Sequence, residues 1–135
     1  MPITALYAGL LAPLFIVLSA RVIGRRREAR IALGPGEDAE LLRRMRVHAN
    51  FAEYAPFALV CLALAESIAT PPITLHLAGI LLLAGRYVHA YGVSRTAERI
   101  RVRVAGMVLT FAAITIAAAA CAFGAAVSLI GSMAP

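Results

Sequence analysis

The sequence contains no lysine, few acidic residues and only two cysteines. Charged residues make up 15% of its 135 residues and hydrophobic residues 61%, whereas soluble domains have roughly a quarter charged and half apolar. Cys61 and Cys121 each lie inside an apolar run, without a CxxC pair or a Cys/His cluster of metal-ligand spacing. We therefore expect no disulfide and no metal site, and we expect lipid around most of the chain.

All 13 basic side chains are arginine. This fits either a GC-rich bacterial genome or a need for planar donor groups that bind carboxylates through two hydrogen bonds. A formal net charge of +6 is compatible with a nucleic-acid partner, but the arginines gather in two short stretches between apolar runs. No basic and aromatic binding surface accompanies them. The excess charge therefore indicates membrane topology, and we expect no nucleic-acid partner.

Apolar runs of the length needed to cross a membrane, ~20 helical residues, recur along the whole chain. They predict a single domain over 1–135, with helices at about 3–23, 38–68, 73–92 and 102–130. The first run has no charged residue before Arg21, so it lacks the basic start of a cleavable signal peptide. The expected fold is an all-α bundle of four transmembrane helices.

The connections after the first and third runs carry most of the arginines: Arg25, Arg26, Arg27, Arg30, Arg43 and Arg44 in one, and Arg95, Arg99, Arg101 and Arg103 in the other. By the positive-inside rule both connections face the cytoplasm. The uncharged turn at 69–72 then lies on the outer side, as do both termini.

Gly34-Pro35-Gly36 and the acidic residues after it predict that the second helix begins near Glu37. The Ala-rich fourth run predicts either close helix packing or merely a biased genome composition.

The inner end of the second helix carries polar residues at an unusual depth. At ~100° per residue, Arg46, Asn50 and Glu53 share one narrow sector. Glu53 lies about two turns inside the hydrocarbon boundary, where an ionised carboxylate costs a few kcal/mol, so it should face protein and find a cation. Either this row is a structural network between helices, or it binds a polar ligand at the cytoplasmic edge.

The third and fourth helices bring further polar groups to the same level. Arg86 and His89 share a face, and Glu53 or Glu66 is expected to supply a charge to Arg86. His89 is either a proton donor and acceptor or a hydrogen-bonding packing residue. Each of the four predicted helices carries an arginine near the same cytoplasmic level of the membrane: Arg21, Arg46, Arg86 and Arg103. These arginines either neutralise lipid phosphates or hold an anion.

The stretch RVHANFAEYAPF at 46–57 resembles the signature of the MAPEG family, the membrane-associated proteins of eicosanoid and glutathione metabolism. VLSAR at 17–21 and GRYVHAYG at 85–92 extend the resemblance over essentially the whole chain, which is most similar to the small bacterial branch. The resemblance implies a multi-pass protein of the bacterial inner membrane and a homotrimer. It also implies glutathione bound between subunits near the cytoplasmic side.

Position by position, the resemblance implies that Arg46, Asn50 and Glu53 bind glutathione, with Tyr54 beside them. Arg21 would reach a glutathione carboxylate, and Arg86 and His89 would line the same cleft. Arg103, or Arg101 if the short loop aligns differently, would stabilise the thiolate. The arginines and the carboxylate complement the charged ends of the peptide, and a guanidinium favours loss of the thiol proton.

These roles predict a glutathione-dependent transferase or peroxidase acting on hydrophobic electrophiles that enter from the lipid. The alternative is a non-catalytic binder of lipid or another hydrophobic ligand. Val93 and Met107 stand where some relatives carry Tyr, which favours the alternative. A small drug exporter is disfavoured because 10–18 holds no carboxylate, and a haem protein because His48, His76 and His89 show no paired ligand spacing.

Overall fold

The computed structural model describes residues 1–94 and 99–133, and within them all regular structure is helical. The helices are α1 (Pro2–Ala29), α2 (Ala39–Ser67), α3 (Pro72–Val93) and α4 (Ile100–Met133). All 4 are long and apolar enough to cross a membrane. The predicted all-α fold with four membrane-spanning helices is confirmed. Arg95, which we used to predict the topology, lies outside the described residues.

α1 extends more than a turn beyond its predicted end at residue 23. Arginine, glutamate and alanine are good helix formers, and they continue the helix once it has left the apolar run. The helix stops at Arg30, whose φ of 55° is left-handed and whose backbone N–H donates to the carbonyl of Arg27 at 3.3 Å.

α2 begins beside Asp38, close to the predicted start. The Asp38 carboxylate accepts a hydrogen bond from the Leu41 backbone N–H at 2.8 Å and one from Arg25 at 2.9 Å. The Leu41 bond and the Arg25 guanidinium hold the pKa of the Asp38 carboxyl below its usual range, although partial desolvation opposes them. This cap therefore stabilises the start of α2 at neutral pH, and the stabilisation is lost as the pH falls through the lowered pKa.

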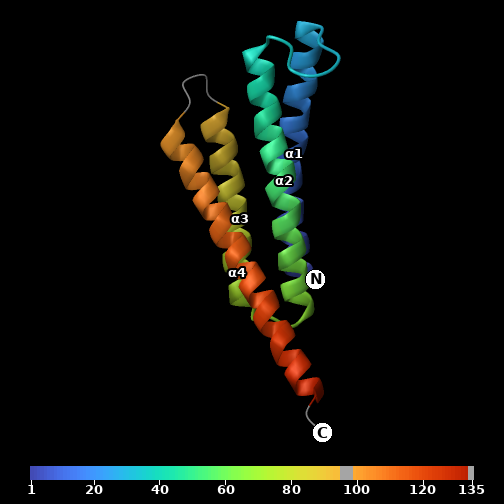
Figure 1. The fold of residues 1–135 in the computed structure, drawn as a ribbon, viewed down its shortest axis with the longest axis vertical. Coiled ribbons are helices and arrows are strands. Elements are labelled where there is room, and N and C mark those ends of the chain that lie inside the picture. The colour runs from blue at the N-terminus through green and yellow to red at the C-terminus, as the bar shows by residue number, and fades with distance from the viewer. Residues whose placement is uncertain (95–98, 134–135) are drawn as a thin grey trace.

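The four helices form two hairpins, α1 with α2 and α3 with α4 (Figure 1). The hairpins converge near the α2–α3 turn and diverge toward the α1–α2 connection, as Figure 1 shows. We call the diverging end the Arg-rich end, because the arginine-bearing segments 21–30, 43–46 and 99–103 lie there. The divergence leaves room between α2 and the α3–α4 hairpin.

The converging end is held by polar contacts between helices. The Glu66 carboxylate accepts from the backbone N–H groups of Ile3 and Thr4, at 3.0 and 2.8 Å, which caps the N-terminus of α1. The Tyr7 hydroxyl lies 3.0 Å from Nδ1 of His76. Glu66 is thus committed to α1, and the prediction that it supplies a charge to Arg86 is wrong.

Glycines allow α3 and α4 to approach closely. A Cβ added at Gly106 would lie 2.5 Å from the backbone nitrogen of His89, and one at Gly85 would lie 2.9 Å from the carbonyl oxygen of Gly106. Each glycine thus faces backbone that cannot turn aside, as is common where membrane helices pack. This packing fixes His89 of α3 relative to Arg103 of α4, because the two residues lie on the two helices that cross here.

A Gly106→Ala variant is expected to lose stability by about 1–3 kcal/mol, the usual cost of overpacking, because the two helices must separate. Gly9→Ala is the matched control, since a Cβ there meets nothing within 4 Å. The control should be neutral or slightly stabilising, because alanine favours the helix more than glycine. Unfolding in detergent by denaturant titration measures both; equal stability of the two variants would contradict the close α3–α4 contact.

The Ala-rich half of α4 does not pack as close helix contact would require. Ala113 and Ala117 are buried, but Ala118, Ala119 and Ala122 are exposed in this chain. Within the single chain, close packing thus holds only for part of this segment, and packing against a neighbouring copy stays a prediction. Small residues bring α4 near its neighbours at the α3–α4 crossing and also at Gly124, where an added Cβ would lie 2.5 Å from the Ile68 side chain.

Candidate functional site

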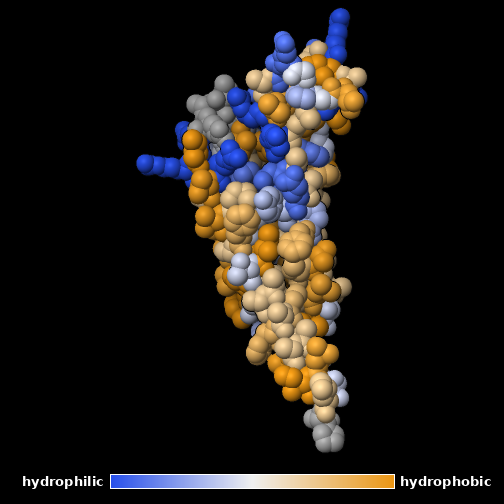
Figure 2. Space-filling view, in the orientation of Figure 1, coloured by the Kyte–Doolittle hydropathy of each residue, from blue (hydrophilic) through white to orange (hydrophobic). Residues whose placement is uncertain are grey.

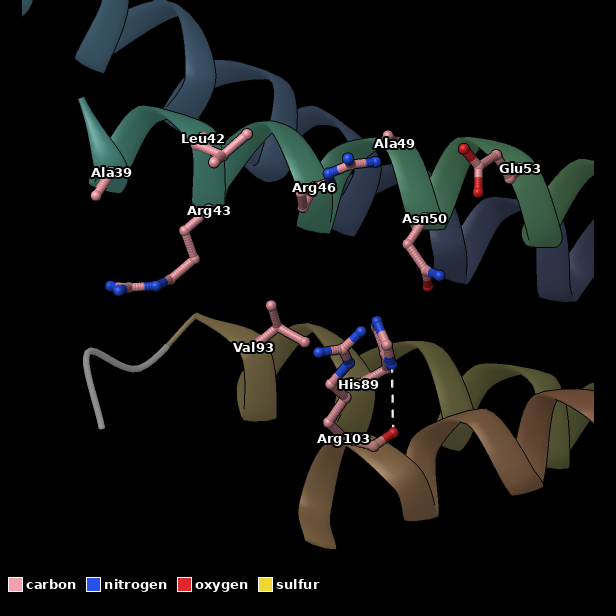
Figure 3. A pocket seen from close by; sticks show the side chains of 10 residues that line it. All are labelled: Ala39, Leu42, Arg43, Arg46, Ala49, Asn50, Glu53, His89, Val93 and Arg103. Atoms are coloured by element: carbon pink, nitrogen blue, oxygen red, sulfur yellow. Dashed lines mark hydrogen bonds between the residues drawn. The ribbon is translucent and has the colours of Figure 1, made fainter. Parts of the chain in front are cut away.

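A cavity of about 520 Å³ lies at the Arg-rich end, between α2 on one side and α3 and α4 on the other (Figure 3). This volume is within the range of small-molecule sites, roughly 300–1,000 Å³. The residues that line it are Ala39, Leu42, Arg43, Arg46, Ala49, Asn50, Glu53, His89, Val93 and Arg103. Figure 2 shows hydrophilic side chains gathered in a hollow over this half of the molecule, above a largely apolar surface.

The row predicted on α2 lies along one wall of this cavity. Arg46, Asn50 and Glu53 all line it, and they are spaced along the helix as the 3.6-residue period requires. His89 of α3 and Arg103 of α4 stand on the opposite wall (Figure 3). Nδ1 of His89 lies 3.3 Å from the backbone carbonyl oxygen of Arg103, which joins the two helices behind the cavity.

Arg86 lies beneath the cavity floor and is only 1% exposed. Its guanidinium donates to Oδ1 of Asn50 at 2.7 Å, to the Asn50 backbone oxygen at 3.3 Å and to the Thr110 hydroxyl at 3.0 Å. It also lies 5.6 Å from the centre of the Tyr54 ring and donates to the Met107 sulfur at 3.3 Å. Arg86 therefore ties α2, α3 and α4 together.

None of these partners is a carboxylate. The prediction that Glu53 supplies a counter-charge to Arg86 is wrong, because amide, hydroxyl, sulfur and ring partners surround the guanidinium instead. A buried cation held by neutral groups is costly unless its hydrogen bonds are well made. The network is therefore expected to tolerate few changes.

The bond from Arg86 decides which end of the Asn50 amide faces the cavity. Arginine carries only donors, so the Asn50 oxygen must turn toward it. The Asn50 NH₂ group then remains to donate to whatever occupies the cavity. A bound ligand must present an acceptor, such as a carboxylate or a peptide carbonyl, at this position.

Glu53 is exposed in this single chain and lines the cavity. It forms no salt bridge among residues 1–94 and 99–133. Our prediction that it pairs with a cation is thus wrong for the described part of the chain. Arg46 lies on the same face but seven residues away, which is ~10 Å along a helix. The Glu53 carboxylate is the acidic side chain that lines the cavity, opposite several donors.

Besides Arg86, three of the predicted binding and catalytic residues do not line the cavity. Arg21 is on the other side of α2, where its guanidinium donates to the Ser94 hydroxyl at 2.8 Å, at the end of α3. Tyr54 is half-buried between Arg86 and Phe111. Arg101 is exposed and does not line the cavity, whereas Arg103 does.

Two residues of the site were not among our predicted site residues. Arg43 lines the cavity; it lies three residues before Arg46 and seven before Asn50, so the same helical period would have placed it. Thr110 accepts from Arg86 and donates to the carbonyl of Gly106 at 2.8 Å. That role depends on the α3–α4 crossing, which the sequence pattern does not specify.

Known proteins match most of this sequence. The model of the MAPEG family matches residues 4–123. The chain is also similar to the inner membrane protein YecN of Escherichia coli strain K12, with 38% identity over 112 residues, 83% of this chain and 84% of YecN. YecN of Escherichia coli O6:H1 strain CFT073 matches to the same extent. With its four candidate spans, the chain is a multi-pass inner membrane protein. It belongs to the MAPEG family.

Proposed function

We propose that the cavity at the Arg-rich end binds glutathione and that the protein is a glutathione-dependent transferase or peroxidase acting on hydrophobic electrophiles. The observation that carries the proposal is the composition of the cavity wall. Three guanidinium groups, one oriented amide, one carboxylate and one imidazole reach the same space from three helices. They belong to Arg43, Arg46, Asn50 and Glu53 of α2, His89 of α3 and Arg103 of α4.

These groups match the charges of glutathione, which has two carboxylates, one ammonium group and a thiol. Arginine binds carboxylates through paired, charge-assisted hydrogen bonds, and the Asn50 NH₂ group donates to a carboxylate or peptide oxygen. The Glu53 carboxylate is an acceptor for the ammonium group. The carboxylates of the ligand thus add partners for these guanidinium groups, of which Arg43 is already ion-paired with Glu40 at 2.9 Å.

Thiol activation requires a cation at the reacting sulfur. The ordinary thiol pKa is ~8.5, and a nearby guanidinium favours the thiolate. Arg103 lies on the cavity wall opposite Asn50 (Figure 3), whereas Arg101 does not line the cavity, so we assign thiolate stabilisation to Arg103. An apolar electrophile then reaches the sulfur laterally from the lipid, through the gap between the hairpins.

We extend the proposal to a homotrimer with both termini on the outer side of the membrane. The distribution of arginines supports this orientation, because segments 21–30 and 99–103 lie at one end of the bundle. Glu53 is exposed in the single chain at membrane depth, which supports cover by a neighbouring copy.

Two residues favour the alternative of a non-catalytic binder of lipid or another hydrophobic ligand. Val93 lines the cavity without a hydroxyl, and the sulfur of Met107 is already bonded to Arg86. Both positions carry Tyr in some of the relatives that the sequence resembles. A protein without these hydroxyls keeps the fold and the cavity but holds glutathione less firmly.

Titration calorimetry of the detergent-solubilised protein with glutathione separates the two functions. The native protein should give saturable heat, and Arg46→Ala and Glu53→Gln should each weaken binding by about 1.5–3 kcal/mol, the worth of a hydrogen bond to a charged group, or roughly 10- to 100-fold. Arg99→Gln, exposed and outside the cavity, is the control and should bind as the native protein does. No heat with the native protein would exclude the glutathione-dependent function and support the non-catalytic one.

A further inference from the structure

A second, shallower hollow of about 360 Å³ lies at the C-terminal end of α1, away from the cavity described above. Arg26, Arg27 and Arg30 line it together with the apolar side chains of Ile23, Ile31 and Ala32. None of its lining residues is acidic. We call it the α1 groove; it combines a dense positive charge with an apolar surface.

The groove is formed because the chain folds back after α1. The Ile31 backbone N–H donates to the Arg26 carbonyl at 3.0 Å, and the Arg26 guanidinium donates to the Gly34 carbonyl at 2.9 Å. These bonds fix the connection against the helix and occupy Arg26. The side chains of Arg27 and Arg30 make no hydrogen bond or ion pair with residues 1–94 or 99–133, so their donors remain for an external anion.

The depth of the groove in the membrane is set by the length of α1. The helix has 28 residues and is therefore ~42 Å long, whereas the hydrocarbon core takes up ~30 Å. A span that begins at Pro2 thus leaves the hydrocarbon near Arg21–Ile23. Arg27 and Arg30 then lie at the level of the lipid phosphates, while Ile23, which is 50% exposed, borders the acyl chains.

We propose that the α1 groove binds one anionic phospholipid of the adjacent leaflet. Its phosphate accepts hydrogen bonds from Arg27 and Arg30, and an acyl chain lies against Ile23. Guanidinium groups bind phosphate oxygens strongly, and clusters of arginines beside a membrane helix recognise anionic headgroups. The neighbouring Leu33, which is 91% exposed, adds an apolar contact with the interface.

Native mass spectrometry of the purified full chain tests the lipid site, with phosphatidylglycerol and phosphatidylcholine as probes. The native protein should bind one phosphatidylglycerol before any phosphatidylcholine. R27Q/R30Q should bind phosphatidylglycerol about 30-fold more weakly, since each basic residue near an anionic headgroup contributes about fivefold. R27K/R30K keeps the charge and should bind within a few-fold of the native protein.

The matched control is R99Q/R101Q, which removes the same charge from exposed positions at the same end of the bundle. It should leave phosphatidylglycerol binding unchanged. Equal weakening in the control and in R27Q/R30Q would overturn the proposal, because it would show a general charge effect. So would equal affinity for the two lipids, or a change of oligomeric state in R27Q/R30Q without a change in lipid binding, which would indicate that a second copy occupies the groove.

Discussion

An Arg86→Ala variant should lose about 3 kcal/mol or more of stability. The substitution leaves a cavity where a long side chain was 1% exposed, and it removes the donor to Asn50 and Thr110. Large-to-small changes in packed cores commonly cost 2–5 kcal/mol, and orphaned polar groups add to that cost. Denaturant titration in detergent measures the loss.

Two further variants separate packing from hydrogen bonding at this position. Arg86→Met fills most of the volume and removes a buried cation, so it should recover part of the stability. It should not recover glutathione binding, because Asn50 is no longer held with its NH₂ group toward the cavity. Arg101→Ala is the surface control and should stay within about 0.5 kcal/mol of the native protein. Unchanged glutathione affinity in Arg86→Met would contradict the orienting role of Arg86.

The second large effect concerns the reacting thiol. An Arg103→Gln variant should lower kcat/KM for glutathione conjugation at neutral pH by about tenfold or more, because it removes the guanidinium that favours the thiolate. Under our proposal Arg103 lowers the pKa of the bound thiol, so the loss of kcat/KM should be largest below pH ~8.5. It should disappear at higher pH, where the thiol ionises without help. The pH profile of kcat/KM, with a hydrophobic electrophile such as a nitroaryl halide, measures this shift.

Three comparison variants make the assignment specific. Arg103→Lys retains a positive charge and should keep most of the rate, with a profile close to that of the native protein. Arg99→Gln, which lies outside the cavity, should leave the profile unchanged. Should Arg101→Gln shift the profile while Arg103→Gln does not, the thiol would lie on the other side of α4 from the cavity and our assignment would be wrong.

Sequence patterns predicted the helices because each apolar run is about as long as the hydrocarbon requires or longer, and in a membrane the backbone must satisfy its own hydrogen bonds. They predicted the α2 wall of the cavity for a similar reason. Arg46, Asn50 and Glu53 recur at the helical period among apolar neighbours, and all three line the cavity. The helix ends were less accurate, because Arg25, Arg26 and Arg27 continue α1 into the headgroup region.

Contacts between helices could not be predicted in the same way. The partners of Arg86 depend on how α3 crosses α4 at Gly85 and Gly106, and a helical period says nothing of that crossing. Arg21 was placed with the other arginines by depth alone, but it extends from α1 on the other side of α2 from the cavity and donates to Ser94. Charge considerations also misassigned Glu66, since backbone N–H groups at the start of α1 satisfy that carboxylate.

A structure of the protein determined with glutathione tests the central claim most directly. We expect the peptide between α2 and the α3–α4 hairpin, with its ammonium group at Glu53, an oxygen at the Asn50 NH₂ group and its sulfur near Arg103. Glutathione bound outside this cavity, or a cavity still empty at saturating glutathione, would contradict it.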